Sequence, residues 1–209
     1  MYTLWIANKN YSSWSLRPWI LLKILQIPFE ENLCYFENGK SSHEKFQRFS
    51  PSGQVPCLID GNLTIWDSLA ICEYVAEDFP QVWPKEKQAR AWARCASAEM
   101  HSGFTALRQQ CPMNITRCEA LPEISHELQA NLNRLQQLWQ EGFDRFGGPW
   151  LAGKEFTTVD AFFVPVASRI HSYQLPVNTQ AKQWVDNILA LPAMQEWQKS
   201  ASQEPQIEH

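Results

Sequence analysis

The sequence predicts an α/β domain followed by an all-helical domain. Two patterns support this: short apolar runs alternate with amphipathic segments before residue 80, and apolar residues keep a helical spacing after residue 88. The change of pattern coincides with two prolines in the segment 79–84, which mark a linker. We therefore expect one domain over 1–80, a linker over 81–88 and a second domain over 89–209.

The first domain is predicted to contain both strands and helices. The predicted strands cover 3–6, 30–36, 55–59 and 63–65, and the predicted helices cover 15–26, 42–49 and 67–79. The tripeptide Asp60-Gly61-Asn62 lies between two apolar runs, which is a strong hairpin signal. The resulting order, β-α-β-α-β-β-α, indicates a thioredoxin-like domain.

The second domain is predicted to be helical throughout. Apolar residues recur at helical spacing over 89–107 and over 124–146, where Gly147-Gly148-Pro149 ends the helix. A third helix begins at Thr157, and Asp160 three residues later resembles the acid of a capping box. Two further short helices are indicated by Trp184 with Ile188 and by Met194 with Trp197.

The composition argues against several function classes. A formal net charge of −4 does not suit a general nucleic-acid binder. The apolar runs are too short for a signal-peptide core or a membrane span. The six cysteines form no C-x-x-C pair and the five histidines form no H-E-x-x-H motif. We therefore expect reduced thiols, a cytoplasmic location and no metal site.

Serine residues are concentrated in the segment Ser12-Ser13-Trp14-Ser15, at the first predicted strand-to-helix junction. One hydroxyl is enough to cap a helix by accepting a bond from a free N–H group of the first turn. Pro18 suits that first turn, where a missing N–H group costs little. Because helix N-termini favour anions, the surplus of hydroxyls predicts an anion site at this junction.

Two later motifs each allow a structural and a functional interpretation. Pro56 interrupts a strand-like run; it is either a plain trans proline at a strand start or a cis proline that turns the backbone groups of Val55 toward an extended peptide ligand. Asp67-Ser68 precedes a helix and either caps it or binds a ligand. In the second case Ser68 would hold a carboxylate and Asp67 an ammonium group.

Taken together, the serine cluster, Gly53-Gln54-Val55-Pro56, Asp67-Ser68 and the helical second domain resemble a cytosolic glutathione S-transferase. The resemblance is to the serine-type branch near the zeta and tau classes, including bacterial members. It covers nearly the whole chain and rests on the order and spacing of the motifs. It implies the glutathione S-transferase fold, a homodimer, a role in detoxification, and glutathione as the co-substrate that attacks a small hydrophobic electrophile.

The resemblance also implies the catalytic residue. The zeta-like motif S-S-C-S-x-R has its catalytic serine five positions before the arginine, which corresponds here to Ser12 and Arg17. Ser13 is the second candidate, and Ser15 is then expected to be the helix cap. The serine would donate its O–H to the glutathione sulfur and so lower the pKa of the thiol.

The remaining candidate site residues also follow from the resemblance. Gln54, Val55 and a cis Pro56 would contact glutathione, and Asp67 with Ser68 would hold its γ-glutamyl end. Lys40 or His43 would meet its glycine carboxylate. The electrophile pocket is expected between the domains, with walls formed by Trp14, Met100, Phe104 and Arg108.

Three of these pocket residues have an equally good packing interpretation. The helical spacing also predicts Met100 and Phe104 as core residues, and Trp14 suits packing between the domains. Trp14 stands where the zeta motif has cysteine, which puts maleylacetoacetate isomerase activity in doubt. The alternatives to conjugation are a glutathione-dependent disulfide reductase or peroxidase, a zeta-type cis–trans isomerase, and a non-catalytic glutathione-binding or interaction protein.

Overall fold

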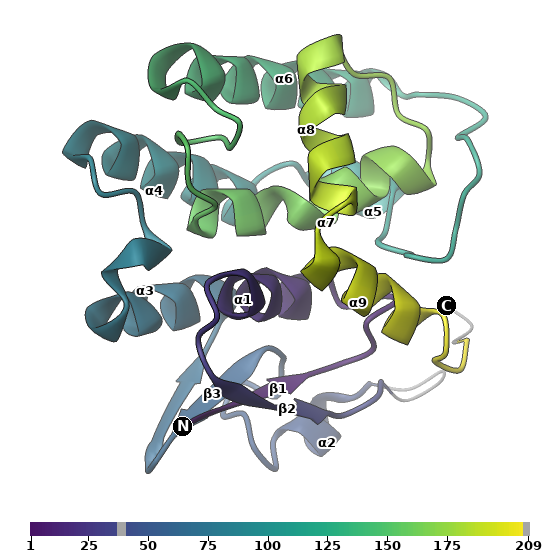
Figure 1. Ribbon diagram of the computed structural model, residues 1–209. Coiled ribbons are helices and arrows are strands. Elements are labelled where there is room, and N and C mark those ends of the chain that lie inside the picture. The colour runs from purple at the N-terminus through teal and green to yellow at the C-terminus, as the bar shows by residue number, and fades with distance from the viewer. Residues whose placement is uncertain (37–40, 207–209) are drawn as a thin grey trace.

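The computed structural model describes residues 1–36 and 41–206, and it confirms the predicted fold class: a thioredoxin-like N-terminal domain is followed by a helical C-terminal region (Figure 1). The strands are β1 (Tyr2–Ile6), β2 (Phe29–Leu33), β3 (Cys57–Asp60) and β4 (Leu63–Trp66). The helices are α1 (Ser13–Ile24), α2 (His43–Phe46), α3 (Ser68–Asp78), the short 3₁₀ turn η1 (Pro80–Val82), α4 (Lys87–Ser102), α5 (Thr105–Gln110), α6 (His126–Phe146), α7 (Thr158–Ser172), α8 (Thr179–Leu189) and α9 (Pro192–Ala201).

The strands form one mixed sheet in the order β2-β1-β3-β4. β1 pairs in parallel with β2 and antiparallel with β3, and β3 pairs antiparallel with β4. Helices α1 and α3 cover one face of the sheet and α2 lies toward the other (Figure 1). The predicted hairpin is confirmed: Asp60 pairs with Leu63 across a turn in which Gly61 has φ +59°, a conformation that favours glycine.

Several predicted boundaries in this domain were wrong. α1 begins at Ser13 rather than at residue 15. β2 ends at Leu33 rather than at 36, because its partner β1 ends at Ile6, the residue opposite Leu33. β3 begins at Cys57 rather than at 55, since Pro56 has no N–H group to donate to a ladder.

The predicted helix over 89–107 is in fact two helices. α4 ends at Ser102, and Phe104 takes a left-handed conformation with φ +54° before α5 begins. Gly103 donates its N–H to the carbonyl of Glu99 at 2.8 Å, and a Cβ atom at Gly103 would come within 2.7 Å of that carbonyl oxygen. Glycine therefore permits this break between the helices, because a side chain at position 103 would collide with the Glu99 carbonyl; the apolar spacing alone did not reveal the break.

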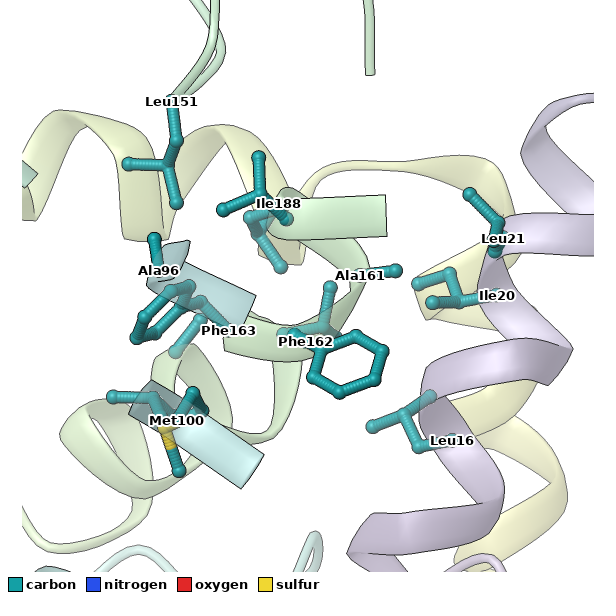
Figure 2. Packing of buried hydrophobic residues seen from close by; sticks show 14 of the residues in the cluster. Leu16, Ile20, Leu21, Ala96, Met100, Leu151, Ala161, Phe162, Phe163 and Ile188 are labelled. Atoms are coloured by element: carbon teal, nitrogen blue, oxygen red, sulfur yellow. The ribbon is translucent and has the colours of Figure 1, made fainter. Parts of the chain in front are cut away.

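The core joins the N-terminal domain to the helical region through α1 and α7. Figure 2 shows Leu16 and Ile20 of α1 facing Phe162 of α7, with Met100 and Phe163 gathered on the other side of that helix. All five side chains are fully buried. This shared core positions the start of α1 against the helical region, and α1 starts with the serine cluster.

Candidate functional site

A cleft of about 580 Å³ opens beside the start of α1. It is lined by the loop before that helix, by the segment before β3 and by the junction between β4 and α3. Its lining residues are Tyr11, Ser12, Ser13, Trp14, Phe36, Phe46, Ser52, Gln54, Val55, Pro56, Trp66, Asp67 and Ser68. The cleft thus brings together eight residues that the sequence analysis proposed from three separate segments.

The N-termini of α1 and α3 both open onto this cleft. Ser12 occupies the cap position of α1, and Ser68 is the first residue of α3. Each helix start presents the positive end of the helix dipole. Two such ends on one cleft, together with serine hydroxyls, favour an anionic ligand.

Ser12 and Ser15 are hydrogen-bonded to each other. The Ser12 hydroxyl donates to Ser15 Oγ at 2.7 Å, and Ser15 Oγ also accepts the N–H of Ala7 at 3.3 Å. The expectation that Ser15 caps the helix is wrong. Because α1 starts at Ser13, Ser15 lies inside the first turn, and its hydroxyl ties that turn to the end of β1.

Asp67 is the cap of α3, as its structural interpretation predicted. Its Oδ1 accepts the N–H groups of Leu69 at 2.8 Å and Ala70 at 3.3 Å. Its backbone φ is +76°, an unusual value for a residue with a side chain. Beside it, Ser68 is almost fully buried, and its hydroxyl has no hydrogen-bond partner among the residues that the structure describes. Ser68 therefore offers the cleft an unused polar group.

His101 is a site residue that the sequence analysis missed. Its Nε2 lies 3.2 Å from Oδ2 of Asp67, although the two residues come from different domains. Burial lowers the pKa of His101, the Asp67 carboxylate opposes that effect, and the charges of Arg17 and Arg108 add to it. No local pattern could have found this pair, because its members lie on separate helix ends far apart in the chain.

Trp14 both lines the cleft and packs between the domains. The Arg17 guanidinium carbon lies 4.1 Å from the centroid of the Trp14 ring, and that of Arg108 lies 5.1 Å from it. His101 meets the same ring edge-on at a centroid distance of 5.1 Å. Full burial lowers the pKa of Arg17 to about 9, with a further contribution from nearby arginines. Trp14 thus lies between the cleft and two cations, one from α1 and one from α5.

Two other predicted pocket residues lie in the core instead. Met100 has no exposed surface, and Phe104 is only 6% exposed. Both belong to the main apolar cluster, because the apolar face of α4 continues into the turn before α5. Arg108 is half-buried and donates to the carbonyl of His101 at 3.1 Å.

The segment before β3 presents its backbone to the cleft. The Val55–Pro56 peptide bond is cis, Val55 is half-buried and Gln54 is exposed. His43 packs against Gly53 and contacts Gln47 at 3.0 Å between side-chain nitrogens. Lys40, the other candidate for the glycine carboxylate, lies outside the described residues.

The cleft also has aromatic walls that the sequence analysis did not identify. They are Tyr11, Phe36, Phe46 and Trp66. Trp66 is 45% exposed, which is unusual for so large an apolar side chain. Its position directly before Asp67, at the end of β4, was the one available signal.

Within residues 1–36 and 41–206, no group of three or more His, Cys, Asp or Glu side chains is placed to hold a metal ion. No described helix combines the length and apolar character that crossing a bilayer requires.

Comparison with known proteins agrees with this geometry. Residues 11–78 match the family model described as glutathione S-transferase, N-terminal domain. A probable maleylacetoacetate isomerase from Vibrio cholerae is 27% identical over 92% of each chain. Glutathione S-transferase theta-1 from Mus musculus is 27% identical over 71% of this chain and 67% of its own.

The fold also matches a solved structure. A glutathione transferase homolog from Burkholderia, crystallised with bound glutathione, superposes with a TM-score of 0.71 at 22% identity, covering 97% of this chain and 99% of its own. At that identity the likeness establishes the fold.

Proposed function

We propose that this chain, which has the glutathione S-transferase fold and whose residues 11–78 match the model of that family's N-terminal domain, is a glutathione transferase. In this proposal the cleft binds glutathione and activates its thiol for attack on a hydrophobic electrophile. The supporting observation is that Ser12, Ser13 and Ser68 line a single cleft at two helix N-termini. That arrangement suits a tripeptide with carboxylates and a thiol that ionises.

The γ-glutamyl end of glutathione is assigned to the start of α3. Ser68 Oγ is free to donate to the ligand carboxylate, since no described residue occupies it. The positive end of the α3 dipole favours the same negative charge. Oδ1 of Asp67 is occupied by the N–H groups of Leu69 and Ala70. Its Oδ2 contacts His101 Nε2 at 3.2 Å and keeps a second lone pair, which accepts the ligand ammonium group.

The thiolate is assigned to the start of α1. The Ser12–Ser15 bond can reverse direction, because hydroxyl protons rotate and the two oxygens lie 2.7 Å apart. Ser15 then donates to Ser12, and Ser12 turns its own proton toward the sulfur. A donor bond to the thiolate favours the charged form, and each tenfold gain in ionisation corresponds to about 1.4 kcal/mol. The Val55 backbone, before the cis proline, pairs with the cysteinyl part of the ligand.

Ser12→Ala tests the catalytic assignment. The variant is expected to conjugate glutathione to a chlorinated nitrobenzene roughly tenfold or more slowly, because one key donor to the developing charge is lost. Glutathione affinity should change little. Ser13→Ala is the matched control on the neighbouring hydroxyl; the reverse pattern between the two variants assigns the role to Ser13. Unchanged turnover in both variants removes the serines from the mechanism.

Ser68→Ala tests the binding assignment separately. This variant should be retained less well on immobilised glutathione, since the ligand carboxylate loses a hydroxyl donor. Full retention makes Ser68 a helix residue with no part in ligand binding.

A second candidate function is cis–trans isomerisation of the maleylacetoacetate type. It is favoured by the Vibrio cholerae relative, which is a probable maleylacetoacetate isomerase. Trp14 at the position of the motif's cysteine weighs against it. Turnover of maleylacetoacetate in the presence of glutathione decides between the two functions. Assays with hydroxyethyl disulfide and cumene hydroperoxide test the reductase and peroxidase alternatives on the same preparation.

We also propose a cellular location, an oligomeric state and a domain organisation. A cytoplasmic homodimer with a detoxifying role, organised as domains 1–80 and 89–209 around a linker, is part of what we propose. Trp14, which lines the cleft, and Arg108, which contacts the Trp14 ring, remain the proposed contacts for the electrophile.

A further inference from the structure

The loop between β1 and α1 carries the serines, and its own backbone bonds do not account for its position. Asn8 accepts the N–H groups of Tyr11 at 3.1 Å and Ser12 at 2.8 Å, which closes the loop locally. The N–H groups of Lys9 and Asn10 point away from that turn. Their partner comes from the other end of the chain.

That partner is Glu204, three residues after the end of α9. Its Oε1 accepts the N–H of Lys9 at 2.8 Å, and its Oε2 accepts the N–H of Asn10 at 3.1 Å. One carboxylate thus spans two successive backbone donors of the loop that leads into Ser12. Bonds from backbone N–H groups to a carboxylate are stronger than neutral ones, which makes this a firm attachment.

The last helix holds the same loop from a second side. Trp197 of α9 donates its Nε1–H to the carbonyl of Lys9 at 2.8 Å. The Lys9 ammonium lies 5.2 Å from the ring centroid of Trp19 and 5.5 Å from that of Trp197, and it pairs with Glu31 at 2.7 Å. Lys9 is therefore fixed through its N–H, its carbonyl and its side chain.

Asn10 is fixed in a comparable way by the segment before α6. Its carbonyl accepts the N–H of Ile115 at 3.2 Å, and its Oδ1 accepts the N–H of Thr116 at 3.0 Å. The backbone N–H that remains is the one bound by Glu204. The helical region thus grips residues 9 and 10 from two directions, immediately before the catalytic serine.

We propose that Glu204 is a positioning residue for thiol activation: by holding the backbone of Lys9 and Asn10, it fixes the loop that aims the Ser12 hydroxyl into the cleft. This inference rests on the proposed function, because it assumes that Ser12 or Ser13 stabilises the thiolate. The geometry supports it since a donor must stay within hydrogen-bond distance of the sulfur, and a small displacement of the loop removes that bond.

The experiment compares Glu204→Ala, Glu204→Gln and the control Gln203→Ala in the full-length protein. Gln203 is the exposed neighbour on the same tail. For each variant we would measure turnover with a chlorinated nitrobenzene, the KM for glutathione, the fraction of bound glutathione present as thiolate by ultraviolet absorbance, and Tm.

Glu204→Ala is expected to lower both turnover and the thiolate fraction about tenfold, with the KM for glutathione within about twofold of wild type. Glu204→Gln should recover part of the loss, because its single amide oxygen still accepts one of the two N–H groups. Gln203→Ala should match wild type in all four measurements.

Two outcomes overturn the proposal. In one, Glu204→Ala and Gln203→Ala have the same turnover and thiolate fraction. In the other, both Glu204 variants lose glutathione binding and Tm together, which makes the residue structural. The Ser12→Ala,Ser13→Ala double variant separates this test from the proposed function. If that variant keeps the wild-type thiolate fraction, the serine mechanism itself fails; if it loses thiolate while Glu204→Ala does not, only the positioning role fails.

Discussion

Replacing Asp160 with asparagine probes the polar centre of the helical region. Asp160 has no exposed surface and joins three parts of the chain. Its Oδ1 accepts the N–H of Leu151 at 2.9 Å and the indole N–H of Trp184 at 3.2 Å. Its Oδ2 accepts the N–H of Thr157 at 3.1 Å, which completes the N-terminal cap of α7.

The expected loss follows from counting these bonds. Asparagine keeps one oxygen, which can retain both bonds of Oδ1, but its NH₂ group then faces the N–H of Thr157. Leaving one buried donor unpaired costs about 1–3 kcal/mol, so Asp160→Asn should lower the free energy of unfolding by that amount above pH 7, where the Asp160 carboxylate is ionised. Asp160→Ala leaves three buried N–H donors without an acceptor and should lower the free energy of unfolding by at least about 3 kcal/mol. That loss is a large part of a typical stability of about 5–15 kcal/mol.

The burial of Asp160 also predicts that the free energy of unfolding depends on pH. Full burial raises the pKa of Asp160 from 3.8 to about 7, even though its three N–H donors act in the opposite direction. In the unfolded chain the Asp160 carboxyl therefore loses its proton near its ordinary pKa of 3.8. In the folded chain it keeps that proton until about pH 7. Linkage then requires that the stability contributed by this group decrease as pH rises from about 4 to about 7 and stay constant above.

Urea denaturation of wild type and Asp160→Asn at several pH values measures both effects. The difference in unfolding free energy between the two proteins should be largest near pH 4 and should shrink toward pH 7, because asparagine does not titrate. A constant difference across that range would refute the raised pKa. A loss below about 0.5 kcal/mol at every pH would refute the bond count, since surface substitutions alone reach that size.

Two further predictions concern packing and thiol access. Gly142→Ala should destabilise the protein by about 1–3 kcal/mol in urea denaturation, because a Cβ atom there would collide with the carbonyl oxygen of Leu151. The control is Gln137→Ala, at an exposed position on the same helix. Equal stabilities of the two variants would contradict the predicted collision. With a disulfide reagent, exposed Cys118 should react in the native protein, whereas Cys111, whose pKa burial raises to about 11, should react only after unfolding. Mass spectrometry of the labelled peptides measures the order of reaction. Labelling of Cys111 in the native protein would contradict its burial.

The elements were predictable wherever their signals are local. The hairpin at Gly61, the end of α6 at Gly147 and the capping box at Thr157 and Asp160 each depend on residues within a few positions of one another. The break between α4 and α5 was not predicted, because the apolar spacing continues through Gly103 while the backbone does not.

The sequence by itself determined the order of strands and helices in the N-terminal domain and the clustering of serine at the start of α1, because backbone preference and apolar periodicity act over neighbouring residues. Only the tertiary structure decided what those serines contact. Ser15 bonds to Ser12 and Ala7 rather than capping its helix, and Asp67 meets His101 across the domains. Glu204 reaches the serine loop from the far end of the chain, since the packing of α9 against α1 brings it there. Such contacts depend on how whole helices pack against one another, which the local sequence around each residue does not specify.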